Sequence, residues 1–222
     1  MSFFVTFVED SYQLTTAGYT ALVILMLALV LVGCALFGGK KKFSAKQLAF
    51  SAIAIALAMI TSMLKLFHLP MGGSITVFSM LFIVLIGYWY GLGGGLTAAV
   101  AYGILQLVCD PYIISVPQLL LDYVFAFGAL GLSGIFSKSK HGLVKGYIVG
   151  VLGRYFFAFL SGFIFFGMYA DAYTSNATLN GIIYSLLYNG AYIIPEAVIT
   201  IILISIPPVS KALARVKEQA VA

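Results

Sequence analysis

Residues 116–136 read VPQLLLDYVFAFGALGLSGIF, an apolar run that holds one charged residue, Asp122. A helix of this length can cross the hydrocarbon core of a bilayer, which takes about 20 residues. A carboxylate inside such a span is rare and costly, and it indicates a functional site by default. The segment therefore predicts a membrane helix that carries part of a binding site.

The whole chain has the composition of an integral membrane protein. Of its 222 residues, 62% are hydrophobic and 9% are charged, and the mean hydropathy is +1.09. Soluble domains carry about 25% charged residues. Seven stretches are apolar and long enough to span a membrane. They lie near residues 17–37, 45–67, 74–90, 92–108, 116–136, 145–168 and 181–206. We expect an all-α, multi-pass membrane protein.

The basic residues predict the orientation, because short loops rich in lysine and arginine stay in the cytoplasm. Ten of the twelve basic residues follow the first, fifth and seventh spans, so the N-terminus is expected outside and the C-terminus inside. This bias accounts for the net charge of +5, and no nucleic-acid partner is needed. The ten residues are Lys40, Lys41, Lys42, Lys46, Lys138, Lys140, Lys145, Lys211, Arg215 and Lys217.

The chain divides into two predicted parts. Residues 1–44 form an additional N-terminal transmembrane helix with a basic linker, and residues 45–222 form a six-helix membrane domain. Residues 91–95 (GLGGG) mark a tight turn between the third and fourth spans. They are not a phosphate loop, since no Gly-Lys-Ser/Thr follows. Cys34 and Cys109 lack metal-ligand or disulfide spacing. We expect no cofactor, no metal and no nucleotide site.

Small residues crowd the first half of the second span. Ala52 and Ala56, like Ala54 and Ala58, are spaced by four, which lets another helix approach closely within a membrane. The spacing alone leaves two interpretations open, packing inside the bundle and docking of another protein's helix.

Polar and aromatic residues gather in the predicted outer third of the bundle. Asp122 lies about 9 Å into its span by helical rise. An anion among aromatic rings and an amide suits a flat organic cation, because each ring adds about 0.5 to 2 kcal/mol of cation–π energy. An interfacial aromatic belt without a ligand is the alternative for each tyrosine. Depth and residue type place seven predicted ligand-binding residues in this layer, and a family resemblance described below adds Tyr123 and Gln118. The seven are Asp122, Tyr184, Asn189, Tyr112, Tyr102, Phe166 and Gly162.

Two further charges lie deeper. Arg154 and Glu196 fall at one depth on the sixth and seventh spans, so we predict a structural ion pair between them. A proton relay at Glu196 is the alternative.

These residues resemble those of a known family, the thiamine-specific substrate-binding subunits (S-components) of energy-coupling factor (ECF) vitamin transporters, the ThiT or YuaJ family. The resemblance covers about residues 45 to 210. It is carried by Gln118–Tyr123 with the following Ala-Phe and Gly131–Gly134, by Arg154-Tyr with Phe159–Phe166, and by Tyr184–Glu196.

The resemblance implies a bacterial plasma-membrane protein with a six-helix S-component bundle, preceded here by one more helix. Such a subunit captures thiamine from outside, works with a transmembrane coupling subunit and two cytoplasmic ATPases, and is thought to topple in the membrane. Asp122 would then be the anion near the bound cation, and Ala52, Ala54, Ala56 and Ala58 would face the coupling subunit.

The chain departs from the family pattern at Ala158, where the family usually has histidine. A pocket without that imidazole makes a related pyrimidine or pyridine vitamin or precursor the runner-up ligand. An intramembrane enzyme that uses Asp122 and Glu196 is the alternative from another class. The two carboxylates are expected on the order of 15 Å apart along the membrane normal, too far for paired-carboxylate hydrolysis. A small channel would need polar residues along several whole spans. We therefore expect a transport protein and no enzyme.

Overall fold

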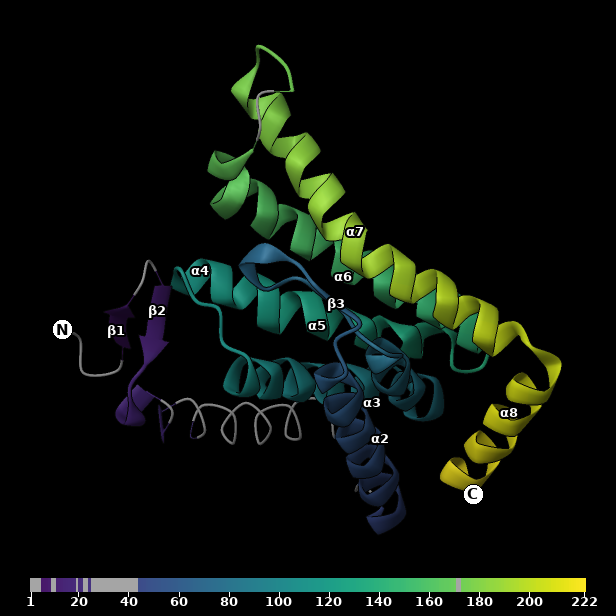
Figure 1. Ribbon diagram of the computed structural model, residues 1–222. Coiled ribbons are helices and arrows are strands. Elements are labelled where there is room, and N and C mark those ends of the chain that lie inside the picture. Colours follow the sequence, from purple (N-terminus) through teal and green to yellow (C-terminus); the bar gives the residue numbers. More distant parts are fainter. Residues whose placement is uncertain (1–4, 9–10, 19, 22–23, 25–43, 171–172) are drawn as a thin grey trace.

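The computed structural model describes residues 5–8, 11–18, 20–21, 24, 44–170 and 173–222. This part of the chain is almost entirely helical, with two small antiparallel hairpins (Figure 1). One hairpin joins β1 (Val5–Val8) to β2 (Ser11–Leu14), and the other joins β3 (Phe67–His68) to β4 (Ser74–Ile75). The predicted first span, 17–37, and its basic linker lie largely outside the described residues.

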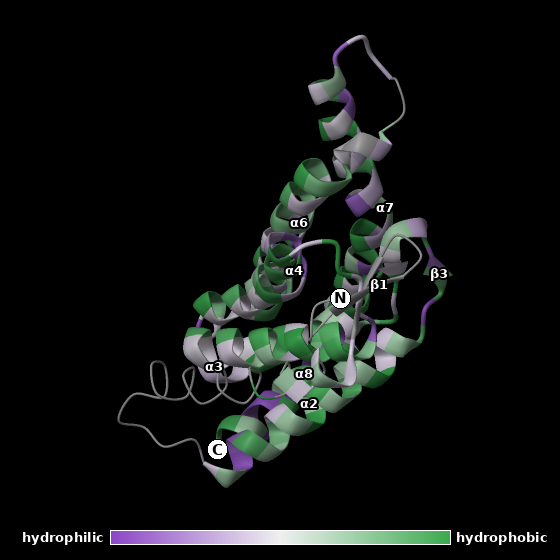
Figure 2. Cartoon of the chain, turned by 90° about the vertical axis from the view of Figure 1, so that its left-hand side faces the viewer, coloured by the Kyte–Doolittle hydropathy of each residue, from purple (hydrophilic) through white to green (hydrophobic). Residues whose placement is uncertain are grey.

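Among the described residues, five helical segments are long and apolar enough to cross a membrane. Figure 2 shows hydrophobic residues over much of their surfaces. Two of them, α6 and α7, run side by side (Figure 1). The segments are α2 (Ala45–Met63), α3 (Ser79–Cys109), residues 116–136, α6 (Gly142–Phe166) and α7 (Ala177–Ser205). Residues 116–136 divide into α4 (Val116–Leu119), the π-helical turn η2 (Leu120–Phe125), α5 (Ala126–Gly128) and the 3₁₀ segment η3 (Ala129–Phe136).

The chain reverses inside α3 at Gly91, where the sequence predicts a tight turn. Gly91 has φ 80° and ψ −171°, a conformation open essentially to glycine. A Cβ added at Gly95 would lie 2.8 Å from the Cα of Gly87. Residues eight apart in a straight helix are separated by about 12 Å. The two halves of α3 therefore pack against each other around Gly91.

Segment η3 approaches the turn of α3 so closely that only glycine fits. A Cβ added at Gly134 would lie 2.3 Å from the carbonyl carbon of Gly91, and one added at Gly131 would lie 2.5 Å from that of Gly95. In membrane proteins, small residues such as glycine let the backbones of two helices approach this closely. The glycines of residues 128–134 thus fix the position of the segment that carries Asp122.

The predicted second span, 45–67, ends later than the helix in the structure, and the predicted third span, 74–90, begins earlier. The structure ends α2 at Met63, begins α3 at Ser79, and folds the chain between them into the β3–β4 hairpin with η1 (Pro70–Gly72) at its tip. Met71 and Gly72 have φ of 62° and 93°, and Pro70 has no amide hydrogen to donate to a helix. These residues break the helix although their neighbours are apolar.

The alanine pairs of α2 face two ways. Ala54 and Ala58 are 2% and 0% exposed and belong to the hydrophobic core, whereas Ala52 and Ala56 are exposed. The prediction that all four form a docking surface is therefore wrong for Ala54 and Ala58, because α2 packs that face against α3.

A C-terminal helix, α8 (Pro207–Val221), follows α7 and turns away from it (Figure 1). Its apolar side chains, among them Leu213 and Val216, pack against the core. The ammonium group of Lys217 lies 3.6 Å from the ring centre of Tyr88. The short η4 (Gly167–Tyr169) follows α6.

Candidate ligand-binding site

A cavity of about 370 Å³ opens between the β3–β4 hairpin, the second half of α3, the segment 110–127, α6 and α7. The lining residues come from stretches far apart in the sequence, which the bundle brings together. All nine residues predicted to bind ligand line it, namely Asp122, Tyr123, Tyr184, Asn189, Tyr112, Tyr102, Phe166, Gln118 and Gly162.

Asp122 lies in the π-helical turn η2 and is oriented by Gln118. The amide Nε2 of Gln118 donates to Oδ2 of Asp122 at 2.6 Å and to the carbonyl of Tyr112 at 3.1 Å. Its Oε1 accepts from the backbone N–H of Ile114 at 3.0 Å. π-Helical turns occur frequently at functional sites. Here the turn lies beside a carboxylate that a buried amide holds in place.

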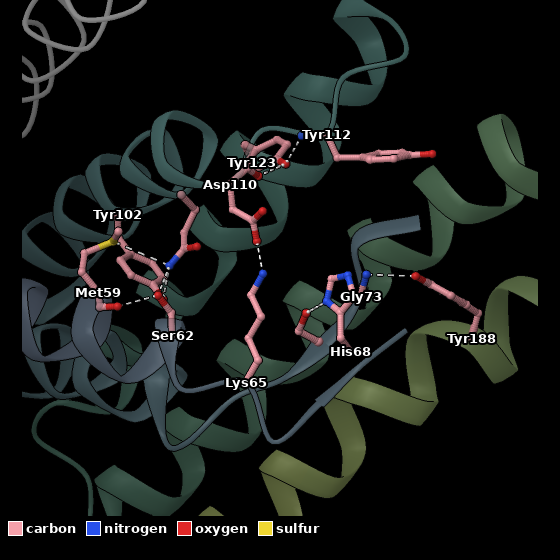
Figure 3. Close-up of polar contacts among 12 residues, drawn as sticks. Met59, Ser62, Lys65, His68, Gly73, Tyr102, Asp110, Tyr112, Tyr123 and Tyr188 are labelled. Atoms are coloured by element: carbon pink, nitrogen blue, oxygen red, sulfur yellow. Dashed lines mark hydrogen bonds and ion pairs between the residues drawn. The ribbon is translucent and has the colours of Figure 1, made fainter. Parts of the chain in front are cut away.

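Tyr123 anchors the loop that carries Tyr112. Its hydroxyl donates to the carbonyl of Asp110 at 2.9 Å and accepts from the N–H of Tyr112 at 2.8 Å (Figure 3). The ring of Tyr112 stacks on Phe166, with centroids 5.9 Å apart. Tyr123 is 8% exposed, so it contributes to the cavity chiefly by placing Tyr112.

Tyrosines on one face of α7 hold the β3–β4 hairpin against the cavity. The hydroxyl of Tyr188 accepts from the N–H of Gly73 at 2.9 Å (Figure 3). It also donates to the carbonyl of Pro70. One turn away, the hydroxyl of Tyr184 contacts the sulfur of Met71 at 3.3 Å. Tyr188 thus joins the hairpin to the cavity wall, a role that the aromatic pattern did not predict.

Asn189 is held from two sides. Its Nδ2 donates to the carbonyl of Ser185 at 3.0 Å, and its Oδ1 accepts from the hydroxyl of Tyr192 at 2.8 Å. A Cβ added at Gly162 would lie 2.8 Å from Asn189 Nδ2. Glycine at this position of α6 therefore lets α7 bring its amide up to the cavity.

Tyr102 and Gln106 form the wall toward α2. The Nε2 of Gln106 donates to the hydroxyls of Tyr102 at 2.7 Å and Ser62 at 2.8 Å. Tyr102 is fully buried. The ammonium group of Lys65 pairs with the carboxylate of Asp110 at 2.5 Å (Figure 3).

The predicted Arg154–Glu196 ion pair is not formed. Lys65–Asp110 is the only salt bridge among the residues that the structure describes. Glu196 accepts from the hydroxyl of Thr76 at 2.7 Å and from the N–H of Met80 at 3.3 Å. It lies at the N-terminus of α3, where backbone N–H groups favour an anion. The depth of Glu196 in its span did not predict that its partners lie at the N-terminus of α3.

Arg154 lines the cavity instead. Its guanidinium carbon lies 4.3 Å from the ring centre of Phe127. Ala158, which stands where the family pattern has histidine, is on the same cavity wall and is 6% exposed. Glu196 is not among the lining residues, so the two carboxylates of the enzyme alternative do not share the cavity.

Sequence reasoning missed several other lining residues, including Ser161, Tyr192, Phe127, Gln106 and the hairpin residues Met71 to Ser74 and Thr76. The hairpin carried a signal in Pro70, Gly72 and Gly73. Ser161 carried none, since a serine on a membrane helix usually bonds its own backbone.

Comparison with known proteins identifies the family of the chain. A family model described as thiamine transporter protein (Thia_YuaJ) matches residues 48–215. The chain belongs to this family. The resemblance noted in the sequence is thereby confirmed, and with it the transport class and the multi-pass membrane character.

Two curated family members show the extent of the likeness. The thiamine transporter ThiT of Bacillus subtilis (strain 168) is 34% identical over 168 residues, which cover 69% of this chain and 83% of the relative. The thiamine transporter ThiT of Lacticaseibacillus paracasei is 30% identical over 133 residues, 52% of this chain and 64% of the relative.

The fold agrees as well. A solved structure of ThiT from Listeria monocytogenes superposes with a TM-score of 0.59 at 26% identity, covering 73% of this chain and 94% of the other. The residues that line the cavity, from Ser62 to Tyr192, all lie within the part of the chain that the family model matches, residues 48–215.

Proposed function

We propose that this chain is the substrate-binding subunit of an ECF-type, ATP-driven vitamin importer in a bacterial plasma membrane, and that it binds thiamine from the extracellular side. The observation that carries the proposal is Asp122, held by Gln118 at the wall of an aromatic cavity. Membership of the thiamine transporter family supports the same ligand.

The chemistry of thiamine fits this cavity. Its thiazolium ring carries a fixed positive charge, for which Asp122 supplies the counter-charge. Its two flat rings suit the aromatic faces of Tyr112, Phe166 and Tyr184, which line the cavity. Asn189 offers an amide to a heteroaromatic edge. These four side chains and Asp122 are the ligand contacts that we propose.

The two halves of α3 count as separate spans in this proposal, which gives a six-helix domain over residues 45–222. The N-terminus lies outside and the C-terminus inside, so the cavity and its hairpin face the exterior.

In this proposal ATP hydrolysis is supplied by partner proteins, since the chain carries no Walker-type phosphate loop. The proposal includes a transmembrane coupling subunit and two cytoplasmic ATPases. The exposed alanines Ala52 and Ala56 on α2 form a small-residue surface for the coupling subunit. Toppling of the subunit would then deliver the vitamin to the cytoplasm.

Mass spectrometry of ligand retained by the detergent-purified chain tests the proposal. Thiamine, released on denaturation in near-equimolar amount, is the expected result. A related pyrimidine or pyridine compound in its place would favour the runner-up ligand, for which the small Ala158 leaves room. Absence of any such compound, together with no heat on titration with thiamine, would reject the proposal.

A further inference from the structure

Three lysines lie close together in the sequence at the end of the bundle opposite the hairpin. Lys138 and Lys140 belong to the turn between η3 and α6, and Lys145 lies near the start of α6. All three are exposed. None of them forms a salt bridge with a described residue, and the sequence has no aspartate or glutamate between Asp122 and Asp171. Residues 137–145, the lysine turn, therefore carry positive charge that no described salt bridge compensates.

The backbone of the lysine turn is held in place by hydrogen bonds. The N–H of Ser139 donates to the carbonyl of Phe136 at 3.0 Å, and the N–H of Gly142 donates to the carbonyl of Ser139 at 2.9 Å. The ammonium group of Lys217, on α8, donates to the carbonyl of Ser137. A surface that is already ordered loses less conformational entropy when it binds a partner.

The exposed surface beside the lysine turn is apolar. Leu152 follows Lys145 by seven residues, so the two share one face of α6 and lie about 10 Å apart along its axis. Leu152 is 60% exposed, and Ile135 on η3 is 56% exposed. A Cβ added at Gly153 would lie 3.3 Å from Leu132. Ile135 follows Leu132 by three residues, which puts both on one side of a 3₁₀ segment. Ile135 therefore lies on the side of η3 that approaches α6 at Gly153.

A cationic turn next to exposed apolar side chains matches the chemistry of an anionic phospholipid. Both α6 and residues 116–136 are long and apolar enough to cross a membrane. Basic pockets at the cytoplasmic ends of membrane helices bind anionic headgroups. An acidic segment of a protein would pair with the lysines but would leave Ile135 and Leu152 unused, so the lipid accounts for more of this surface.

We propose that the lysine turn binds an anionic phospholipid of the cytoplasmic leaflet. Lys138, Lys140 and Lys145 donate to the phosphate oxygens, while Ile135 and Leu152 contact the acyl chains. The inference goes beyond the proposed function and uses only its orientation of the chain, because none of these five residues lines the ligand cavity.

Native mass spectrometry of the full-length chain in detergent tests this inference. Dioleoylphosphatidylglycerol, which is anionic, and dioleoylphosphatidylcholine, which is zwitterionic, are titrated separately, and the fraction of protein that retains each lipid is measured. Wild type should bind phosphatidylglycerol at least about tenfold more tightly, because each lysine near an anionic group contributes about fivefold. The triple variant Lys138→Gln, Lys140→Gln, Lys145→Gln should lose this preference and keep its affinity for phosphatidylcholine.

A second triple variant, Lys46→Gln, Lys211→Gln, Arg215→Gln, is the matched control. It removes the same charge from exposed positions of α2 and α8 that the proposed orientation also places in the cytoplasm. It thus separates a site in the lysine turn from the general bias of cytoplasmic loops toward basic residues. The control should keep the preference for phosphatidylglycerol. Thermal unfolding in detergent verifies that both variants are folded.

Equal affinity of wild type for the two lipids, or equal losses of phosphatidylglycerol in the two variants, would overturn the inference. Unchanged phosphatidylglycerol binding in the variant of the lysine turn would also overturn it, and a loss of vitamin uptake by cells with that variant would then assign the turn to a protein partner. Titration of the same proteins with thiamine reports on the proposed function separately, since the lysine turn lies outside the cavity.

Discussion

The amide of Gln118 donates a hydrogen bond of 2.6 Å to the carboxylate of Asp122, one helical turn along the same segment. Gln118 is 1% exposed, and its remaining polar contacts go to the backbone of Tyr112 and Ile114. The carboxylate is therefore oriented before a ligand arrives, which lowers the entropic cost of binding.

Gln118→Met should weaken thiamine binding by about tenfold and destabilise the fold by about 2 kcal/mol. The change keeps the length of the side chain but leaves the N–H of Ile114 and the carbonyl of Tyr112 without partners. Calorimetric titration and thermal unfolding measure the two effects. Gln47→Ala, at the exposed cap of α2, should leave the affinity at its wild-type value; a loss there would mean that the assay reports general destabilisation.

Tyr188→Phe should speed thiamine release. The substitution removes the hydrogen bonds to Gly73 and Pro70 that hold the hairpin above the cavity, each worth about 1 kcal/mol. Stopped-flow fluorescence measures the dissociation rate. Tyr155→Phe is the control, since its hydroxyl bonds the carbonyl of Leu186 away from the cavity. Equal rates for Tyr188→Phe and wild type would exclude this role of the hairpin.

Gly91→Ala should destabilise the fold by roughly 1 to 3 kcal/mol, because the residue has φ 80° and ψ −171°. Gly167→Ala provides the comparison: its φ is −58°, and an added Cβ there meets its nearest neighbour at 3.5 Å, an ordinary contact. Thermal unfolding in detergent compares the two. A Gly91→Ala protein as stable as Gly167→Ala would contradict the reversal of the chain at this residue.

Glu196 and Arg154 should respond unequally to substitution. Glu196→Leu removes the carboxylate that accepts from Thr76, Ser79 and the N–H of Met80, so we expect the free energy of unfolding to fall by about 2 to 4 kcal/mol. Arg154→Met removes a contact with Phe127, worth about 0.5 to 1 kcal/mol. Denaturant titration measures the free energy of unfolding of both variants. If the two residues formed an ion pair, each single substitution would be strongly destabilising.

The sequence predicted the membrane class and the positions of most spans, because apolar runs of about 20 residues are typical of membrane helices and rare in soluble domains. It also placed Asp122, Tyr184 and Asn189 together, since helical rise converts sequence position into depth. All three line the cavity.

Depth says nothing about rotation around a helix axis, and the errors follow from this. Arg154 and Glu196 share a depth but point to different neighbours. Ala54 and Ala58 occupy the buried face of α2, whereas Ala52 and Ala56 occupy the exposed one.

The most direct test of the proposed binding site is calorimetric titration of thiamine into wild type, Asp122→Asn and Asp110→Asn. Asparagine at 122 can still accept from Gln118, so the fold should persist while affinity falls about 100-fold or more. Asp110→Asn removes the ion pair with Lys65, whose two side chains also line the cavity but are 58% and 32% exposed, and should weaken binding far less than Asp122→Asn. Wild-type affinity in Asp122→Asn would contradict the central claim that this carboxylate binds the cation.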